Sequence, residues 1–197
     1  MHYTETVWRP PYEASSLLLE ATAGCTHHRC KFCTLYADLP FPFRMARLSD
    51  MEEDLKEAEE LYHHRMGRRM SRVFLTGANP FVLKYEKLMK IAERIRAYFP
   101  EVKTIGSFAR VTDITGKTDE ELAALGRVGY DGLTIGMETA DETALAFMDK
   151  GYRASDILEQ CSRLDGAGIH YSFFYLAGIS GAGRAEAGAK STADVCN

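Results

Sequence analysis

The chain alternates short apolar runs with longer stretches in which apolar residues recur every three or four positions. This alternation indicates parallel strands joined by right-handed helical crossovers, which is an α/β fold. An open doubly wound sheet and a (β/α) barrel both fit the pattern. The runs predicted as buried strands are residues 16–21, 73–76, 102–108, 131–137 and 169–176, and the stretches predicted as helices are residues 49–67, 85–98, 119–128, 141–148 and 155–167.

Local signals support several of these elements. Ser49 precedes an acidic first turn and is predicted as an N-cap, and Thr118 with Glu121 has the spacing of a capping box. The basic run at residues 63–69 falls at a predicted helix end, where cations complement the helix dipole. This explanation is preferred to nucleic-acid binding, because the protein as a whole is acidic.

The length of the chain corresponds to one domain. We expect residues 1–15 to form an N-terminal extension and residues 16–197 to form five strand–helix units of that single domain. Residues 185–197 have a helical pattern that no glycine or proline ends. The sequence therefore predicts a chain that stops short of closing its own architecture.

Composition and charge exclude several classes of protein. The formal net charge of −4 offers no general attraction to nucleic acid, so a nucleic-acid partner is not expected. No apolar run approaches the ~18 residues of a membrane span, and the polar N-terminus lacks a signal-peptide core. We expect a cytoplasmic protein with no membrane partner.

The five cysteines are unevenly placed. Cys25, Cys30 and Cys33 form a C-x4-C-x2-C motif just after the first predicted strand, whereas Cys161 and Cys196 stand alone. An odd number without a secretion signal argues against a disulfide framework. Three thiolates on one loop are soft ligands that suit an iron–sulfur cluster or zinc. Because such clusters usually have four cysteine ligands, three would leave one iron free to bind another molecule.

The motif and its surroundings resemble the radical S-adenosylmethionine (SAM) superfamily, in particular small members whose substrate is unassigned. The matching segments are Arg9-Pro10-Pro11, residues 16–19, Gly24-Cys25, the aromatic Phe32 before the last cysteine, and Gly136-Met137-Glu138-Thr139. The superfamily's commonest spacing is C-x3-C-x2-C, so this chain has one additional residue between Cys25 and Cys30, which a loop can accommodate as a bulge.

The resemblance implies a partial (β/α)6-type TIM barrel of which about five units are present. It implies a [4Fe-4S] cluster on Cys25, Cys30 and Cys33 that binds SAM. Reductive cleavage of SAM would give a 5′-deoxyadenosyl radical that abstracts hydrogen from an unknown substrate. A one-electron donor such as a flavodoxin or ferredoxin is the implied partner.

The resemblance also suggests residues that contact SAM. Phe32 would lie against adenine, Arg110 would pair with the carboxylate, and Glu138 would contact the ribose hydroxyls or the methionyl amine. Each has a structural alternative: loop packing, a surface arginine and a salt bridge. The remaining suggested contacts are Gly77 and Asn79, in place of the family's Gly-Gly-Glu-like segment, Ser107 as a hydrogen-bonding residue, and Gly136, which leaves room for the nucleoside.

Two other functions remain open from the sequence. The three cysteines with His27 or His28 could form a structural Cys3His zinc site in a non-redox α/β binding module. An incomplete barrel could also bind the cluster without turnover. Among the other motifs, the glycine-rich residues 178–183 lack a phosphate-loop ending and are expected to form a flexible loop, and the alternating Tyr171, Phe173 and Tyr175 face either the cavity or the core.

Overall fold

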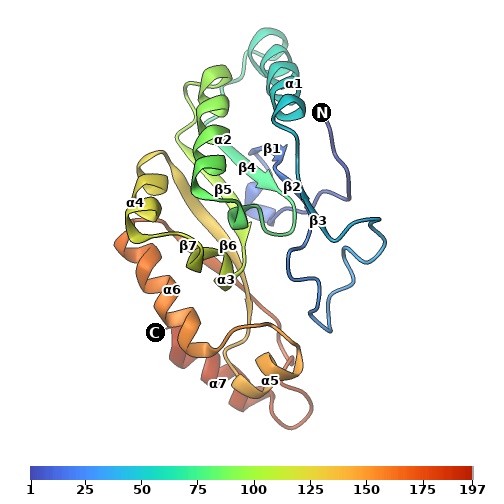
Figure 1. Ribbon diagram of the computed structural model, residues 1–197, viewed down its shortest axis with the longest axis vertical. Coiled ribbons are helices and arrows are strands. Elements are labelled where there is room, and N and C mark those ends of the chain that lie inside the picture. Colours follow the sequence, from blue (N-terminus) through green and yellow to red (C-terminus); the bar gives the residue numbers. More distant parts are fainter. Residues whose placement is uncertain (197) are drawn as a thin grey trace.

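The computed structural model describes residues 1–196 and contains a five-stranded parallel sheet (Figure 1). The strand order is β1-β4-β5-β6-β7, and every neighbouring pair is parallel. β1 and β7 are the two edges, so the sheet is open, as expected of a partial barrel. The strands are β1 (Leu17–Glu20), β4 (Arg72–Thr76), β5 (Thr104–Ala109), β6 (Tyr130–Glu138) and β7 (Tyr171–Tyr175).

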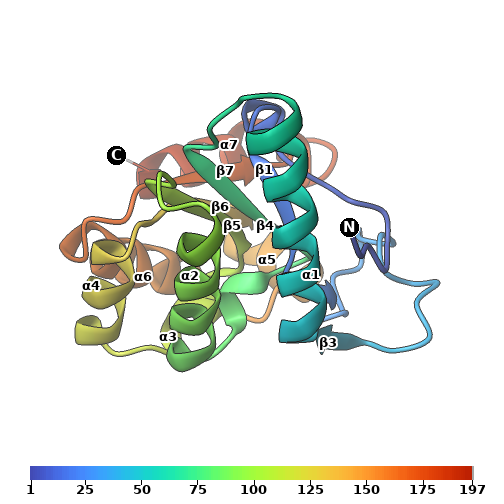
Figure 2. The ribbon, with the colours of Figure 1, turned by 90° about the horizontal axis from the view of Figure 1, so that it is seen from above.

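The predicted alternation is confirmed. Helices α1, α2, α4 and α6 lie along one face of the sheet, and consecutive members of this row contact each other (Figure 2). The helices are α1 (Leu48–Glu59), the π-helix η2 (Glu60–Arg65), α2 (Tyr85–Tyr98), α3 (Val111–Thr115), α4 (Asp119–Arg127), α5 (Glu142–Phe147), α6 (Ala154–Gly166) and α7 (Ala185–Cys196), with short 3-10 turns η1 (Pro11–Glu13) and η3 (Pro80–Val82).

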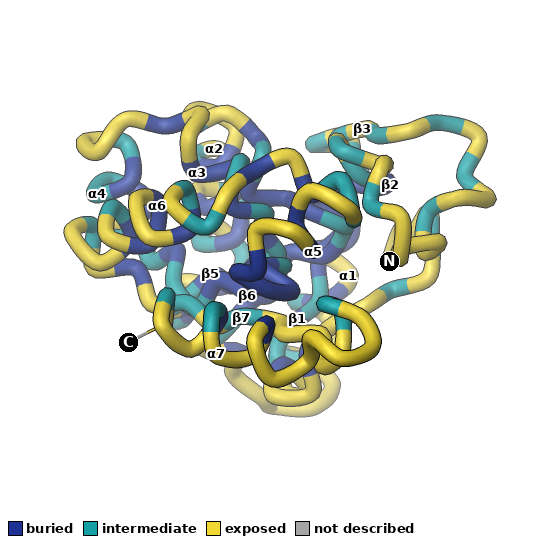
Figure 3. Tube along the Cα trace, turned by 90° about the horizontal axis from the view of Figure 1, so that it is seen from below, coloured by how far each residue is buried: buried dark blue, intermediate teal, exposed yellow. Residues whose placement is uncertain are grey.

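Two short strands were not predicted. β2 (Thr22–Gly24) and β3 (Phe43–Met45) pair antiparallel and form a separate two-stranded sheet. Residues 25–42 connect them as a long loop that carries the three clustered cysteines. This loop extends away from the main sheet and is largely exposed or partly exposed (Figure 3).

The helix ends follow the sequence signals in part. Thr118 caps α4, and the reciprocal bonds between Thr118 and Glu121 confirm the capping box. The prediction of Ser49 as an N-cap is wrong, because α1 begins at Leu48 and its N-cap is Arg47 in an extended conformation. The basic run starts in η2, where the helix widens to a π-helix before the chain turns into β4.

Strand alternation separates a helix-covered face from an open inner face. Tyr171 and Phe173 on β7 pack against the hydrophobic core, which confirms the core alternative for that pair. Thr134 and Ser172 point to the opposite face, where the hydroxyl of Tyr12 contacts both. The N-terminal segment therefore crosses the face of the sheet that the helices leave uncovered.

The core is continuous from β1 to α6. Cys161 on α6 is buried within it, as expected of a small packed side chain. Within residues 1–196, no helix has both the length and the apolar character needed to cross a membrane.

Candidate functional site

A cavity of about 320 Å³ opens at the carboxyl ends of the parallel strands. In parallel α/β folds this is the end at which ligands bind, and the volume falls in the ~300–1,000 Å³ range of small-molecule sites. Much of its lining is aromatic. The lining residues are Trp8, Arg9, Cys25, Cys30, Phe32, Cys33, Leu35, Tyr36, Ala78, Phe108, Ala109, Arg110, Thr134, Gly136, Glu138, Lys150 and Phe174.

The cysteine loop leaves β2 at Gly24, a position at which no other residue fits. Gly24 has φ +75°, and a Cβ there would lie 2.3 Å from the carbonyl oxygen of Pro42. The amide of Cys25 donates to that same carbonyl at 2.9 Å. A tight turn links Cys33 to Cys30 through a 3.0 Å backbone hydrogen bond. These bonds hold the three cysteines at the edge of the cavity.

The additional residue of the motif lies in an anchored bulge. His28 adopts φ +49°, a left-handed conformation that lets the chain turn between Cys25 and Cys30. On either side, His27 bonds the carbonyl of Asp149, and the amide of Lys31 donates to the carbonyl of Met148 at 3.1 Å. The loop is thereby attached to the segment that follows α5.

A second attachment joins the loop to the turn between β4 and η3. The amide nitrogen of Asn79 donates to Thr26 Oγ1 at 2.8 Å and to both carboxyl oxygens of Asp113 at 3.1 Å. Asn79 is fully buried and does not line the cavity. Its side chain therefore braces the residue next to Cys25 against α3.

Asp113 gives the brace a pH dependence. Burial raises the pKa of its carboxyl from 3.8 to about 6. Because the folded pKa lies above the unfolded one, the stability contributed by protonated Asp113 is complete below the unfolded pKa and is lost as the pH rises through 6. The shift corresponds to about 3 kcal/mol.

We therefore expect the free energy of unfolding of wild type to fall by about 2–3 kcal/mol relative to that of Asp113→Asn between about pH 4 and pH 7. Urea unfolding of both proteins across this range measures the difference. Asp194→Asn, at an exposed site on α7, is the matched control and should track wild type. Parallel curves for wild type and Asp113→Asn would contradict the pKa shift.

A buried ion pair lines the cavity. Lys150 Nζ is 3.6 Å from Glu138 Oε1 and donates to the carbonyl of Gly136 at 2.9 Å. Glu138 has φ +67°, a strained conformation for glutamate of the kind that concentrates at functional sites. Burial raises the pKa of the Glu138 carboxyl and lowers the pKa of the Lys150 ammonium, while the opposite charge of each partner counteracts both shifts.

Two cations, Lys150 and Arg110, act on the cysteines. Burial raises the pKa of the Cys30 thiol, and the positive charges of Lys150 and Arg110 oppose that rise. Arg110 also bonds the backbone carbonyl of Lys150, which fixes the two cations next to each other. Since the thiolate is the form that binds metal, the two cations partly offset the effect of burial, which by itself keeps the Cys30 thiol protonated.

The sequence of this chain matches the family model of the Radical SAM superfamily over residues 19–186, which is most of the chain. The chain belongs to the radical SAM superfamily. The curated proteins contain no match to its sequence.

Solved structures of radical SAM enzymes share the fold. The cobalamin-dependent S-adenosylmethionine radical enzyme OxsB has a TM-score of 0.70 at 16% identity over 91% of this chain and 26% of its own. The methyltransferase TsrM from Kitasatospora setae has a TM-score of 0.67 at 19% identity, over 94% of this chain and 34% of its own. Coproporphyrinogen III oxidase (HemN) from Escherichia coli has a TM-score of 0.62 at 17% identity, over 91% of this chain and 41% of its own. The radical SAM chain described here thus spans less than half the length of these enzymes.

The structure brings most of the predicted radical SAM site together. The cavity is lined by seven of the predicted residues, which are Cys25, Cys30, Cys33, Phe32, Arg110, Gly136 and Glu138. Gly136 leaves space beside Glu138, because a Cβ there would lie 3.1 Å from its Oε1. Asn79, Gly77 and Ser107 lie outside the lining.

Gly77 and Ser107 serve the scaffold in this structure. Gly77 has φ +121°, and a Cβ there would lie 2.3 Å from the carbonyl oxygen of Thr22, so glycine permits the close approach of two backbone segments. Ser107 is buried, and its hydroxyl donates to the carbonyl of Phe108 at 2.9 Å.

The sequence did not predict that Lys150, Trp8 and Arg9 line the cavity. Lys150 sits in a short polar loop after α5, where nothing in the sequence distinguishes it from a surface lysine. Trp8 and Arg9 lie before the first strand, in a segment without the apolar periodicity of a helix or a strand. Among residues 1–196, no three His, Cys, Asp or Glu side chains converge on one point as the ligands of a single metal ion would.

Proposed function

We propose that this chain is a radical SAM enzyme whose Cys25, Cys30 and Cys33 bind a [4Fe-4S] cluster beside a SAM site in the cavity. The observation that carries the proposal is that three thiols share one cavity with Phe32, Arg110, Gly136 and Glu138 at the carboxyl ends of the strands. OxsB and TsrM, which have the same fold, have been solved with SAM or a SAM analogue bound, and TsrM also with a [4Fe-4S] cluster.

The donor set fits the cluster. The three cysteines are free thiols on a loop with backbone and side-chain anchors on both sides, and soft thiolates are the usual ligands of iron–sulfur clusters. Held by Cys25, Cys30 and Cys33, the cluster would supply one-electron reduction of SAM, the chemistry from which methionine and a 5′-deoxyadenosyl radical would follow. A Cys3His zinc site would need His28 as its fourth ligand, because the ring of His27 is engaged with the carbonyl of Asp149. His28 lines a small cavity with Cys25, Cys30 and Cys33, so metal analysis decides between zinc and the cluster.

The protein's own residues would orient SAM. The Glu138 carboxylate can accept hydrogen bonds from the methionyl amine or the ribose, and Arg110 and Lys150 can donate to the SAM carboxylate. Phe32, which lies with its ring 5.4 Å from Lys150 Nζ, offers a flat apolar surface for adenine. The lining is largely apolar, so a bound SAM would displace water from it.

The proposal extends to the partner and the compartment. A one-electron donor such as a flavodoxin or ferredoxin would reduce the cluster, and free cysteines suit the reducing cytoplasm. Residues 16–197 would act as a single radical SAM core, with residues 1–15 as its extension.

Anaerobic reconstitution tests the proposed function. We expect about four irons per chain and broad absorbance near ~400 nm. Addition of dithionite and SAM should then give methionine and 5′-deoxyadenosine, measured by liquid chromatography and mass spectrometry. Tight binding of one zinc and no iron would refute the proposal. A loaded cluster without SAM cleavage would refute its catalytic part.

Glu138→Ala should weaken SAM binding at least tenfold while leaving the iron content unchanged. The reason is that a charged hydrogen bond to a bound ligand contributes about 1.5–3 kcal/mol. Calorimetric titration of the reconstituted protein with SAM measures the effect. Glu159→Ala, at an exposed position on α6, is the matched control. Equal SAM affinity for Glu138→Ala and wild type would contradict the role of Glu138.

A further inference from the structure

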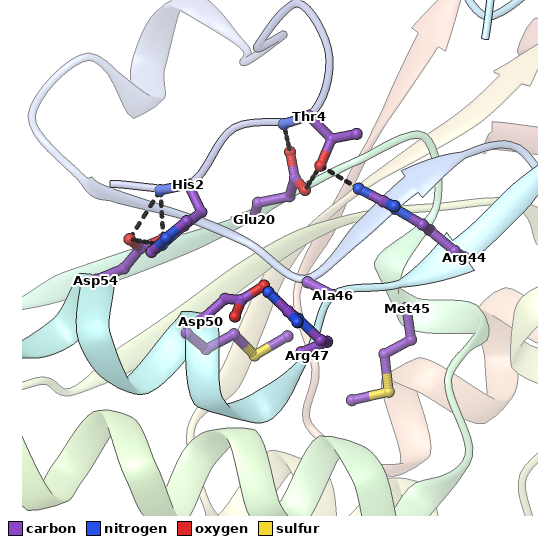
Figure 4. A pocket seen from close by; sticks show the side chains of 10 residues that line it. His2, Thr4, Glu20, Arg44, Met45, Ala46, Arg47, Asp50 and Asp54 are labelled. Atoms are coloured by element: carbon purple, nitrogen blue, oxygen red, sulfur yellow. Dashed lines mark hydrogen bonds and ion pairs between the residues drawn. The ribbon is translucent and has the colours of Figure 1, made fainter. Parts of the chain in front are cut away.

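The N-terminal segment is fixed along its length to the rest of the molecule. The amide of His2 donates to Asp54 on α1 at 2.7 Å, and Thr4 donates to Glu20 at the end of β1 through its amide and its hydroxyl (Figure 4). Arg44 donates to the hydroxyl of Thr4 at 2.8 Å, which is one of the contacts drawn in Figure 4. The segment is therefore a built part of the fold from its first residues onward.

Tyr12 and Glu13 carry the segment across the inner face of the sheet. The Tyr12 hydroxyl lies 2.6 Å from Thr134 Oγ1 on β6 and 2.8 Å from Ser172 Oγ on β7. Glu13 is fully buried and forms a bidentate ion pair with Arg72 at the start of β4.

Two glycines make room for that ion pair. A Cβ at Gly106 would lie 2.4 Å from Arg72 Nη2, and a Cβ at Gly132 would lie 2.6 Å from it. The inner face is thus shaped to receive Glu13 and Arg72 as a floor beneath the cavity.

Above this floor the segment contributes a wall. Trp8 and Arg9 line the same cavity as the cysteines, together with Phe108 and Phe174 from β5 and β7. The rings of Phe108 and Phe174 lie 6.0 Å apart at an angle of 34°. Trp8 and Phe174 remain 45% and 41% exposed, so large aromatic surfaces face open space at this end. Such surfaces pack best against another flat ring system.

The charge of the cavity favours an anion. Arg9, Arg110 and Lys150 line it against the single carboxylate of Glu138. Glu138 is paired with Lys150, whereas no ion pair within residues 1–196 involves Arg9. Arg9 belongs to the N-terminal wall, away from the cysteine loop in sequence. A guanidinium without a protein partner is suited to bind a carboxylate, sulfonate or phosphate bidentately.

We propose that Trp8 and Arg9 form one wall of the substrate subsite, and that the substrate is a flat aromatic or conjugated molecule with a negatively charged group. The flat part would stack among Trp8, Phe108 and Phe174, and the anion would pair with Arg9. The role of this subsite in catalysis rests on the function proposed above, but the binding preference does not require the cluster.

The chain supplies its own reporter, because Trp8 is its single tryptophan. We would titrate the full chain, with and without reconstituted iron, with two probes of similar shape: the anionic anilinonaphthalene sulfonate and the neutral N-phenylnaphthylamine. Both should quench Trp8 emission by energy transfer, and the anionic probe should bind about tenfold more tightly, as one charge-assisted contact implies.

Arg9→Gln should abolish the preference for the anionic probe while leaving the neutral probe unaffected. Arg69→Gln, between η2 and β4 at the other end of the strands, is the matched control and should keep the preference. Phe174→Ala should weaken both probes. Unchanged Trp8 emission with both probes would refute the proposal that Trp8 lines a binding subsite. An intact preference in Arg9→Gln would overturn the anion site. Iron loading and SAM cleavage are measured separately, so a failure of the proposed function would be distinguished from a failure of this inference.

Discussion

Replacing Cys30 by alanine is expected to lower the iron content of the reconstituted protein from about four per chain to less than one. The reason is that two of the three proposed thiolate ligands are too few to hold the cluster. Absorbance near ~400 nm and formation of 5′-deoxyadenosine should be lost together. Metal analysis, the absorption spectrum and a SAM cleavage assay check the three results.

Cys161→Ala is the control for this substitution. Cys161 lies buried in α6 and belongs to the core. Its replacement removes a thiol of the same chemistry at a site far from the cavity, so the iron content should stay at the wild-type value. An iron content in Cys30→Ala equal to that of Cys161→Ala would contradict the ligand set.

Arg72→Met is expected to destabilise the protein by about 3–5 kcal/mol, the usual cost of leaving one member of a buried ion pair without its partner. Glu13 is fully buried, and its two carboxyl oxygens accept from Arg72 at 2.6–3.0 Å. Urea unfolding monitored by circular dichroism measures the loss.

Two further variants test whether this loss of stability comes from the ion pair between Glu13 and Arg72. Glu13→Gln combined with Arg72→Met removes both charges and should recover part of the stability. Arg94→Met breaks an ion pair with Glu52 whose members are 38% and 45% exposed, and it should cost at most about 1 kcal/mol. Equal losses in Arg72→Met and Arg94→Met would show that Glu13 is not buried as described.

The sequence predicts the architecture well because the signals that define it are local. Each strand of the main sheet is a short apolar run, and the Thr118–Glu121 capping box marks a helix start within four residues. The cysteine motif is equally local. It indicates soft metal ligation because three thiols within nine positions must share one loop.

The rest of the site depends on contacts between distant residues. Tyr12 reaches Thr134 across 122 positions, and His27 reaches Asp149 across the same separation. No periodicity or spacing reports such contacts. For Asn79, the sequence indicates a polar residue after a strand, but its orientation depends on Asp113, a buried carboxyl on another element. Lys150 is missed for the same reason, since its burial follows from how the loop after α5 folds back.

The N-terminal segment has a practical consequence for producing this protein. Trimming residues 1–15 would take away Trp8 and Arg9 from the cavity and strip Arg72 of its carboxylate. The first fifteen residues are therefore best left intact, and a purification tag is better attached beyond α7.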